Sequence, residues 1–542
     1  MNKVSFFMEV FFMKRQEIKE AVKLAVDNII YEGCTDVDTF GKPFEIKLLK
    51  GEEIKQKIIL DVTEQIDKIM NNNCKFEELK INKISHILIP KKTFYDFRKC
   101  ALIDVIDEVK YLSLVLLIAK KIEKKRVSNK IAFSYRYKPE NGKLFDKKYN
   151  YSTFKHEYRK ISSMKKYKII IECDISNFYD RLNLHRLNST LLSIDEIDEK
   201  VSNIIDELLL FWANRDSYGL PVGSNASRIL AEAFLIEIDN FLLSNNIKFC
   251  RFVDDYRFFA SDVSEANKIL SKFVEILNKH GLSINLLKTH LRDIKDYHIE
   301  STRKRTNNPE GLSEIIRGYS GVVPIKFRNL SKTEIERLKL EEESELVKKL
   351  KEDSIIEPED IIKSLKIIIA KEKYNDLNEY PNILKKYPQF VPYFSDILQK
   401  HQDKIGEENY KNILNDLCDW IKDDNTQEYI LISIVRLFDC SNNDMKKKLF
   451  DFFKNQKRNS GVYIARSTLE QIDDNLSRGE ILELKDYYLR ADCWEKRQMV
   501  KMILNKLSFP ENRPFIKDLK INGNDYFIQE MIREYEKKNR KK

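Results

Sequence analysis

Two adjacent carboxylates, Asp254 and Asp255, lie within an apolar and aromatic stretch that runs from Phe252 to Phe259. The stretch contains more β-forming than helix-forming residues, which predicts a strand, a tight turn that carries the two aspartates, and a returning strand. A hairpin can hold two acidic side chains at its tip, where a divalent cation could reach them. Because an isolated Asp-Asp pair is more often a solvated turn, the interpretation depends on the rest of the chain.

Two further charged residues follow predicted strands. The apolar run 168–173 predicts a buried strand, and Asp174 stands where it ends. A carboxylate at a strand end beside a hairpin tip is well placed to share a cation with it. Residues 282–289 alternate as a strand and present Lys288 near its end, although a lone strand-end lysine is usually a surface residue.

A glycine-rich turn lies between these acidic elements. The sequence Gly-Leu-Pro-Val-Gly at 219–223 precedes a predicted helix at 229–243. Glycines let the backbone approach a ligand closely, and small polar residues cap a helix. An ordinary capped helix is the alternative interpretation. A second amphipathic helix is predicted at 265–280, with Gly281 as its C-terminal cap.

Two basic segments could contact phosphates. Lys91, Lys92 and Arg98 follow the apolar residues 87–90, and Arg98 is the best candidate because a guanidinium binds phosphate oxygens in bidentate fashion. A solvated loop is the alternative.

The second basic segment covers residues 120–126 and is followed by aromatic residues at 133–137. Basic side chains interleaved with aromatic ones, here Tyr135 and Arg136, suit a nucleic-acid backbone with bases that stack nearby. A charged helix end followed by an edge strand explains the same pattern equally well.

Composition limits the class of protein. A chain of 542 residues is expected to form two or three domains, and a hydrophobic share of 42% argues against wholesale disorder. The net charge of +10 fits a polyanionic partner. Eight cysteines without a CxxC pair predict neither a zinc site nor a disulfide framework, and no apolar run approaches the ~20 residues of a membrane span. We therefore expect a cytoplasmic protein without a membrane partner.

From about residue 330 the strand patterns disappear and amphipathic segments recur to the end of the chain. Short polar connections separate these segments. The pattern predicts stacked helix pairs, although no strict sequence period is present.

Taken together and in order, these motifs resemble the palm of a reverse transcriptase over roughly residues 90 to 300. The segment 174–179 resembles the first metal-binding motif, and 220–223 with Ser227 resembles the second, nucleotide-cradling motif. Residues 252–255 correspond to the Tyr/Phe-x-Asp-Asp box. The fourth motif is represented by Gly281, Leu282, Asn285, Lys288 and Thr289.

The resemblance implies nucleotidyl transfer with two Mg²⁺ ions, for which Mn²⁺ can substitute; such a pair of cations stabilises the attacking and leaving oxygens. Asp174 and Asp254 would bridge the two metals, Asp255 would be a weaker outer ligand, and the carbonyl of Ile175 would add a further ligand. Lys288 would protonate the pyrophosphate leaving group.

The same resemblance assigns substrate contacts. The ring of Tyr179 would exclude a 2′-hydroxyl and so favour deoxynucleotides. Gly223 and Ser227 would cradle the nucleotide, while Arg98 would hold its phosphates.

Departures from the general pattern narrow the family. Val222 stands where the second motif often has Gln, and Ser227 is followed by Arg228 rather than Pro. Together with residues 134–136 and the long helical C-terminal half, this is similar to the bacterial abortive-infection and related phage-defence reverse transcriptases. That family implies HEAT-like helical repeats, a homo-oligomer (trimer or hexamer) and, in some relatives, a noncoding RNA partner. It also implies protein-primed synthesis, for which Tyr526 is a candidate.

The predicted fold class is therefore α+β, a reverse-transcriptase-like right-hand palm and fingers followed by an all-α domain. The expected boundaries are 1–80 for an N-terminal helical extension, 81–325 for fingers and palm, and 326–542 for the helical repeats. The expected substrates are dNTPs, with RNA template or noncoding RNA and DNA product as nucleic-acid partners. A template-copying enzyme of a retron or mobile element, and a catalytically inert nucleic-acid-binding scaffold, are the alternatives.

Overall fold

The computed structural model describes most of the chain in two compact units. One unit comprises Met1–Ser85 and Ala101–Gly311, and the other comprises His86–Cys100 and Leu312–Lys542. The three-part division expected from the sequence stays a prediction. The described residues are 2–35, 37, 40, 43–71, 75–91, 97–297, 317–318, 321–322, 327–341, 356–421, 426–438, 443–455 and 463–540.

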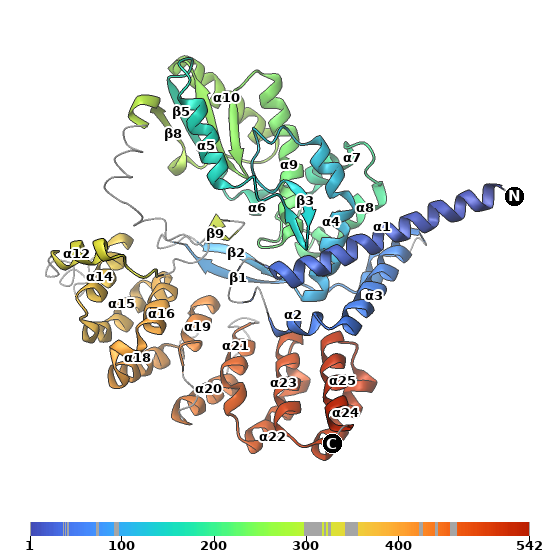
Figure 1. The fold of residues 1–542 in the computed structure, drawn as a ribbon, viewed down its shortest axis with the longest axis vertical. Helices are drawn as coiled ribbons and strands as arrows, with labels where there is room; N and C mark the ends of the chain where they lie inside the picture. The colour runs from blue at the N-terminus through green and yellow to red at the C-terminus, as the bar shows by residue number, and fades with distance from the viewer. Residues whose placement is uncertain are drawn as a thin grey trace. The chain divides into compact units, whose positions relative to one another are not determined.

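A four-stranded sheet lies toward one end of the first unit (Figure 1). Its strands are β5 (Ile169–Asp174), β6 (Phe249–Phe252), β7 (Asp255–Ala260) and β8 (His290–Asp293), in the order β6-β7-β5-β8. All neighbouring strands are antiparallel. The predicted strand at 168–173 and the predicted hairpin around the two aspartates are thus confirmed.

Helices cover both faces of β5, β6 and β7, which explains why most of the residues of these three strands are buried, whereas β8 at the edge is largely exposed. On one face, Tyr256 and Phe258 contact Phe273 of α10 (Val263–Lys279). On the other, Cys250 and Phe259 belong to a buried cluster with residues of α5 (Tyr151–Ser162). Successive strand residues point to opposite faces, so each strand supplies side chains to both layers.

Helices surround the rest of this unit. α9 (Asn225–Ser244) begins earlier than predicted, with Ser224 as its N-cap, and α4 (Val105–Lys125) contacts α1 (Asn2–Glu32), α8 (Glu199–Trp212) and α9. The other elements are α2 (Phe44–Leu49), α3 (Glu52–Asn71), η1 (Phe76–Leu79), β3 (Tyr137–Glu140), β4 (Lys143–Phe145), α6 (Phe178–Arg181) and α7 (Leu184–Leu192).

The predicted strand at 282–289 is wrong. The chain makes one isolated bridge at Ile284, then a short 3-10 turn, η2 (Leu286–Lys288), and forms strand β8 only after Thr289. Leu286 and Leu287 are 78% and 90% exposed, so the alternating apolar pattern did not reflect burial. The predicted helix end is confirmed, since α10 stops at Lys279 and Gly281 has a φ of +72°.

The second unit is mostly helical. It includes most of the strand pair β1 (Ser85–Pro90) and β2 (Phe97–Leu102) and the short pair β9 (Arg317–Gly318) and β10 (Gly321–Val322). The described helical elements are α12 (Lys332–Lys339), α14 (Pro358–Ala370), η3 (Tyr374–Glu379), α15 (Tyr380–Lys386), η4 (Pro388–Phe390), α16 (Val391–Lys400), α17 (Gln402–Ile405), α18 (Glu407–Trp420), α19 (Glu428–Val435), α20 (Asn443–Asn455), α21 (Tyr463–Ile472), η6 (Asp473–Asn475), α22 (Arg478–Tyr487), η7 (Tyr488–Arg490), α23 (Cys493–Lys506), α24 (Phe509–Asn522) and α25 (Tyr526–Arg540).

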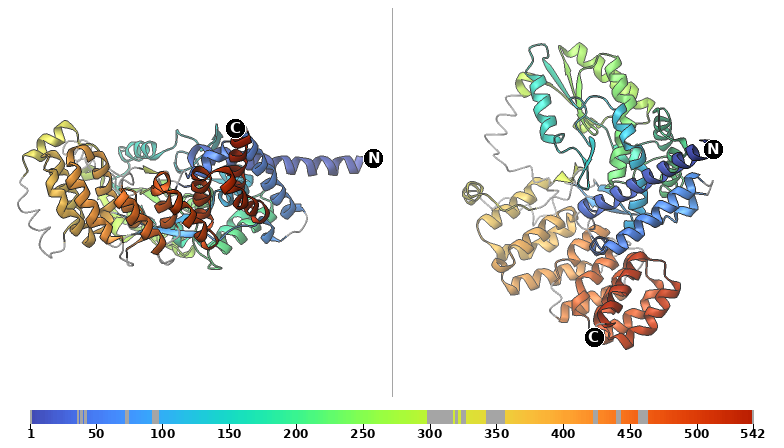
Figure 2. Two further views of the ribbon diagram at one scale, coloured as in Figure 1. Left: turned by 90° about the horizontal axis from the view of Figure 1, so that it is seen from below. Right: turned by 45° about the vertical axis from the view of Figure 1, so that its right-hand side comes forward.

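These helices stack in chain order (Figure 2). α16 contacts α19, α19 contacts α21, α21 contacts α23, and α23 contacts α25. Polar contacts between these helices join residues at similar but unequal separations: Lys448 to Asn415 spans 33 positions, Asn409 to Asn375 spans 34, and Arg497 to Asp525 spans 28. The structure therefore shows a stack of successive helices without one fixed spacing.

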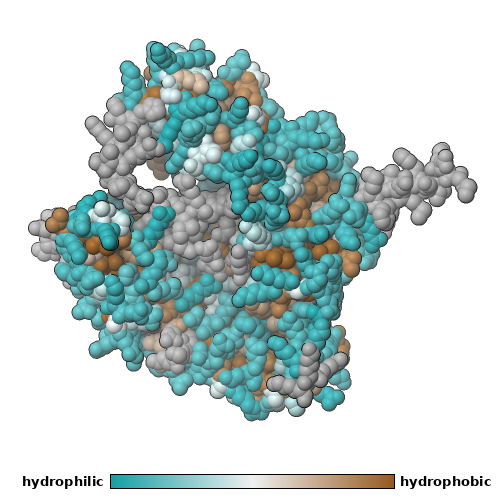
Figure 3. All heavy atoms as spheres, in the orientation of Figure 1, coloured by the Kyte–Doolittle hydropathy of each residue, from teal (hydrophilic) through white to brown (hydrophobic). Residues whose placement is uncertain are grey.

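The face of the molecule drawn in Figure 3 is mostly hydrophilic, with smaller apolar patches. Within the described part of the chain, no helix combines the length and the apolar character that crossing a membrane requires.

Candidate active site

Three aspartates lie at one end of the four-stranded sheet. Asp174, the last residue of β5, lies directly opposite Asp255, the first residue of β7. Asp254 occupies the turn that precedes β7, and its carbonyl oxygen accepts a hydrogen bond of 3.1 Å from the Ile175 N–H. The meeting of strand end and hairpin tip predicted from the sequence is thus confirmed.

This arrangement disfavours ionisation of the turn aspartate. Burial, and next the charge of Asp174, raise the pKa of Asp254 to about 7. Burial also raises the pKa of Asp255, although Arg257 opposes the shift. The carboxylates thus form a region of surplus negative charge that a cation would stabilise.

Side chains around the site supply partial compensation. Lys288 Nζ lies 3.0 Å from Asp174 Oδ2, and Asn285 Nδ2 donates to the same oxygen at 3.4 Å. Arg257 pairs with Asp255, which also accepts a hydrogen bond of 3.4 Å from the Tyr151 hydroxyl. Lys288 therefore reaches the site from η2, even though the strand predicted to carry it is absent.

The ammonium group of Lys288 is held in its charged form. Burial lowers the pKa of Lys288, but attraction to Asp174, Asp254 and Asp255 outweighs this effect and the net shift is upward. This side chain therefore carries a proton and a positive charge at neutral pH.

The carboxylates match magnesium in donor chemistry, because Mg²⁺ prefers oxygen ligands and the site has excess negative charge. Within the described residues, no group of three or more His, Cys, Asp and Glu side chains is gathered as a metal site. Asp174 and Asp255 are instead paired with Lys288 and Arg257. A bound cation would replace these pairings in part.

Tyr179 lies on α6, immediately after the first of the carboxylate motifs. Its hydroxyl is buried and has no hydrogen-bond partner within the described structure. Burial is the main cause that raises the pKa of Tyr179 well above its ordinary value, and Tyr135 is the next. Arg228 opposes this shift, and Asp254 adds to it. Its carbonyl accepts a 2.9 Å hydrogen bond from the Leu220 N–H, so the predicted gate residue is joined to the glycine-rich turn.

The glycine-rich turn has the backbone that its sequence suggests. Gly223 has a φ of +117°, a conformation that favours glycine, and the next residue caps α9. Ser227 is fully buried, and its hydroxyl lies 3.0 Å from that of Tyr111 on α4. In this structure Ser227 therefore joins two helices and is not exposed to a nucleotide.

Residues 89–306 match the family model described as reverse transcriptase (RNA-dependent DNA polymerase). This segment is a reverse transcriptase domain. Such a domain belongs to RNA-directed DNA polymerases, which are nucleotidyltransferases. A comparison with curated protein sequences finds no match.

Among solved structures, similar chains come from telomerases. Truncated apo telomerase from Candida tropicalis is 18% identical, with 39% of this chain and 49% of that chain covered and a TM-score of 0.28. Candida albicans telomerase with a TWJ fragment of telomeric RNA is 14% identical, with 73% and 66% covered and a TM-score of 0.29. Apo telomerase from Candida tropicalis is also 14% identical, with 74% and 68% covered and a TM-score of 0.29. The chain spans about half to two thirds of these proteins, and TM-scores this low assign no function.

Within the reverse transcriptase domain, Tyr135 and Arg136 are 4% and 5% exposed. Arg136 donates to the carbonyls of Ala132 and Val127, at 2.8 and 2.5 Å, and to Glu123 at 3.0 Å. Both side chains are committed to the protein interior. In this structure neither residue is exposed for the contact with nucleic acid that the sequence predicted.

The remaining basic candidates fall within the matched segment but belong to the second unit, not the first. Arg98 is on β2 and Lys91 follows β1, both in the second unit, and Lys92 is outside the described residues. Their role as phosphate contacts stays a prediction.

Sequence reasoning missed a buried ionic network behind the hairpin. Glu232 and Asp239 of α9, with Arg251 of β6 and Arg126, are between 0 and 8% exposed. The available signal was the occurrence of charged residues inside strongly apolar segments, since such residues are rarely buried unless paired.

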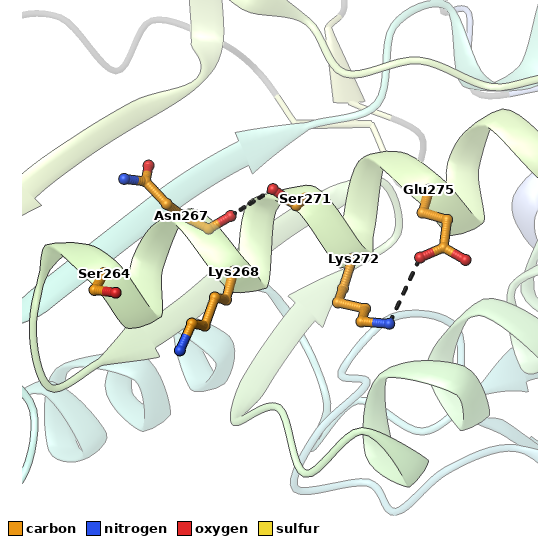
Figure 4. A pocket seen from close by; sticks show the side chains of 6 residues that line it. All are labelled: Ser264, Asn267, Lys268, Ser271, Lys272 and Glu275. Atoms are coloured by element: carbon orange, nitrogen blue, oxygen red, sulfur yellow. Dashed lines mark hydrogen bonds and ion pairs between the residues drawn. The ribbon is translucent and has the colours of Figure 1, made fainter.

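A shallow hollow on α10 lies apart from these groups in the fold (Figure 4). One helix supplies all six lining residues, and none is a predicted site residue. Its internal contacts are those of a solvated helix face: Ser271 donates to the carbonyl of Asn267, and Lys272 pairs with Glu275.

Proposed function

We propose that this chain is a DNA polymerase, RNA-directed or template-independent, that adds deoxynucleotides by two-metal nucleotidyl transfer. One observation carries the proposal: Asp174 and Asp255 lie opposite each other on adjacent strands, with Asp254 in the turn between β6 and β7, inside the segment that matches the reverse transcriptase family. The raised pKa of Asp254 supports a site that is completed by a cation.

Asp174 and Asp254 are the residues that would hold Mg²⁺ or Mn²⁺, with Asp255 and the carbonyl of Ile175 in support. When bound, the metal ions would stabilise charge on the attacking and leaving oxygens. Lys288, which carries a proton beside Asp174, is suited to donate it to the departing pyrophosphate.

Substrate selection is proposed to involve the first unit. The ring of Tyr179 would exclude a 2′-hydroxyl and so favour dNTPs, and Gly223 would let the backbone approach the nucleotide. Arg98 belongs to the second unit, and its role as a phosphate contact is proposed from the sequence alone. Because Ser227 is fully buried, any contribution that it makes acts through the seating of α9 on α4.

We place the activity in antiphage defence. Support comes from the sequence departures in the second motif and from the long run of stacked helices, which we interpret as HEAT-like repeats. On the same basis we propose that the chain assembles into a trimer or hexamer and acts in the cytoplasm. We further propose use of a template or noncoding RNA and priming from a tyrosine such as Tyr526, the first residue of α25.

The test is to incubate the purified chain with Mg²⁺ and each labelled dNTP separately, without added template, and to run the products before and after protease digestion. Label that stays with the protein until digestion supports protein-primed synthesis, and RNase pretreatment separates RNA-templated from template-free addition. Label that appears only with added primer and template favours a template-copying enzyme of the retron or mobile-element kind. No label under any condition leaves the scaffold alternative and contradicts the proposal.

A further inference from the structure

The turn between β6 and β7 has an unusual backbone. Val253 and Asp254 are its two central residues, and Val253 has a φ of +56°. In a two-residue hairpin turn, a positive φ at the first central position is usually supplied by glycine. A β-branched residue is disfavoured there, so the surrounding structure must impose this conformation.

Both backbone polar groups of Val253 are held by buried side chains. Its N–H donates to Ser134 Oγ at 2.9 Å, and its carbonyl accepts from Arg251 Nη1 at 3.3 Å. Ser134 and Arg251 are both 0% exposed. The turn is thus fixed on each side of its strained residue.

Ser134 is itself brought to the turn by backbone pairing. The Phe133 N–H donates to the Arg251 carbonyl at 3.0 Å, and the Arg251 N–H donates to the Ile131 carbonyl at 2.8 Å. Tyr135, the next residue, also has a positive φ, of +46°, and its ring contacts that of Phe252. Residues 131–135 therefore form a rigid support alongside β6.

The ionic network fixes the two residues that hold Val253. Glu232 accepts from Ser134 Oγ and pairs with Arg251 at 2.9 Å and Arg126 at 2.5 Å. Arg251 also donates to Asp239 through Nε and Nη2, at 2.9 and 2.7 Å. With two carboxylates and two guanidiniums the network is neutral overall, and such buried networks are weak evidence for stability but can specify one conformation.

We propose that Ser134, held by Glu232 and Arg251, is a positioning residue that keeps Val253 in its left-handed conformation and thereby turns Asp254 toward Asp174. This role rests on the proposed cation site. It adds three side chains, Ser134, Glu232 and Arg251, that support the site without touching substrate. Ser134 acts at the turn, and the ionic network acts through Ser134 and Arg251.

The test compares Ser134→Ala, Val253→Gly and the double variant in the full chain. Mn²⁺ affinity is measured by electron paramagnetic resonance, and dNTP incorporation is measured separately. Residues that orient metal ligands typically change metal affinity by about 10–100-fold, so Ser134→Ala is expected to weaken Mn²⁺ binding about tenfold and to lower kcat more than it changes the dNTP KM. Glycine adopts a positive φ without support, so Val253→Gly in the Ser134→Ala background is expected to restore most of the lost affinity.

Ser113→Ala is the matched control, because Ser113 is also 0% exposed and its hydroxyl donates only within α4, to the Val109 carbonyl. If Ser134→Ala alone does not fold, the proposal predicts that the double variant does. Ser134→Ala indistinguishable from Ser113→Ala, or a double variant no better than Ser134→Ala, would overturn the proposal. A wild-type chain that binds Mn²⁺ but adds no nucleotide would instead reject the proposed function, and the positioning role would still be decided by the affinities; absence of Mn²⁺ binding would reject both.

Discussion

The sheet of the first unit and the helical stack of the second use polar contacts in opposite ways. Around the sheet, buried charges join residues at irregular and long separations, such as Arg126 and Glu232, 106 positions apart. In the stack, polar contacts between neighbouring helices join residues at similar and shorter separations, such as 33 positions for Lys448 with Asn415 and 28 for Arg497 with Asp525. Such a contact supports one helix against the next, whereas a unique buried network can fix a single turn. The difference indicates that side chains around the sheet, more than those of the stack, fix the position of the candidate active-site residues.

The largest effect is expected at the carboxylates. Asp174→Asn keeps the side-chain shape but removes the charge that pairs with Lys288 and that a cation would need, so dNTP incorporation is expected to fall about a thousandfold. Asp216→Asn, at an exposed position, is the control and should retain full activity. Equal activity of the two variants would remove Asp174 from the chemistry.

The next effect compares two fully buried arginines, one from each unit. Arg251→Met leaves Glu232 and Asp239 buried with fewer partners and should lower the free energy of unfolding by about 3–5 kcal/mol. Arg466→Met should cost less, about 1–3 kcal/mol, since its partner Glu470 is 29% exposed and can be hydrated. Urea unfolding combined with hydrogen exchange would assign each loss of stability to its unit. Equal losses would contradict the expected difference between the two arginines.

A pH-dependent effect is expected at Glu108 of the first unit. Burial raises its pKa to about 8, against the weaker opposing effects of Ser224 and Arg228. Between pH 4.5 and 8, Glu108 keeps its proton in the folded chain but loses it in the unfolded chain. Its contribution to the free energy of unfolding therefore falls as pH rises, by up to about 1.4 kcal/mol per pH unit. Glu108→Gln should therefore gain stability over wild type between pH 5 and pH 8. The exposed Glu78→Gln should show no such trend, and a parallel pH profile for wild type and Glu108→Gln would contradict the expectation.

The smallest effect is expected in the helical stack. Ser477 caps α22 in a capping box with Glu480, so Ser477→Ala should cost about 1 kcal/mol. Hydrogen exchange should increase near α22, while incorporation per folded molecule stays unchanged. A large loss of activity would show that a change in the stack affects the active site, and would contradict a purely local effect on α22.

Much of the sheet could be predicted from the sequence because its residues carry a local signal. The apolar runs before Asp174 and around Asp254 have strand composition, and Gly281 ends α10 where expected. Lys288 was predicted in the wrong element, but its position beside Asp174 was predicted correctly, because the chain turns back toward Asp174 after Gly281.

The buried network could not be predicted in the same way. Ser134 and Glu232 are 98 positions apart, and nothing local to either residue indicates that they meet. Tyr135 and Arg136 fit a nucleic-acid contact by composition, but Tyr135 packs on Phe145 and Arg136 pairs with Glu123 inside the protein. Burial of a charge depends on its partner, and the partner is set by the fold.

We propose that the carboxylates at the hairpin perform metal-dependent nucleotidyl transfer. The most direct measurement is incorporation of labelled dNTPs by the wild-type chain and by the Asp254→Asn, Asp255→Asn double variant, with Mg²⁺ and with a chelator. We expect that the wild-type chain incorporates dNTPs only with Mg²⁺, and that the double variant does not incorporate them although its fold is intact by circular dichroism. Incorporation that persists in the variant, or that never occurs in wild type, would contradict it.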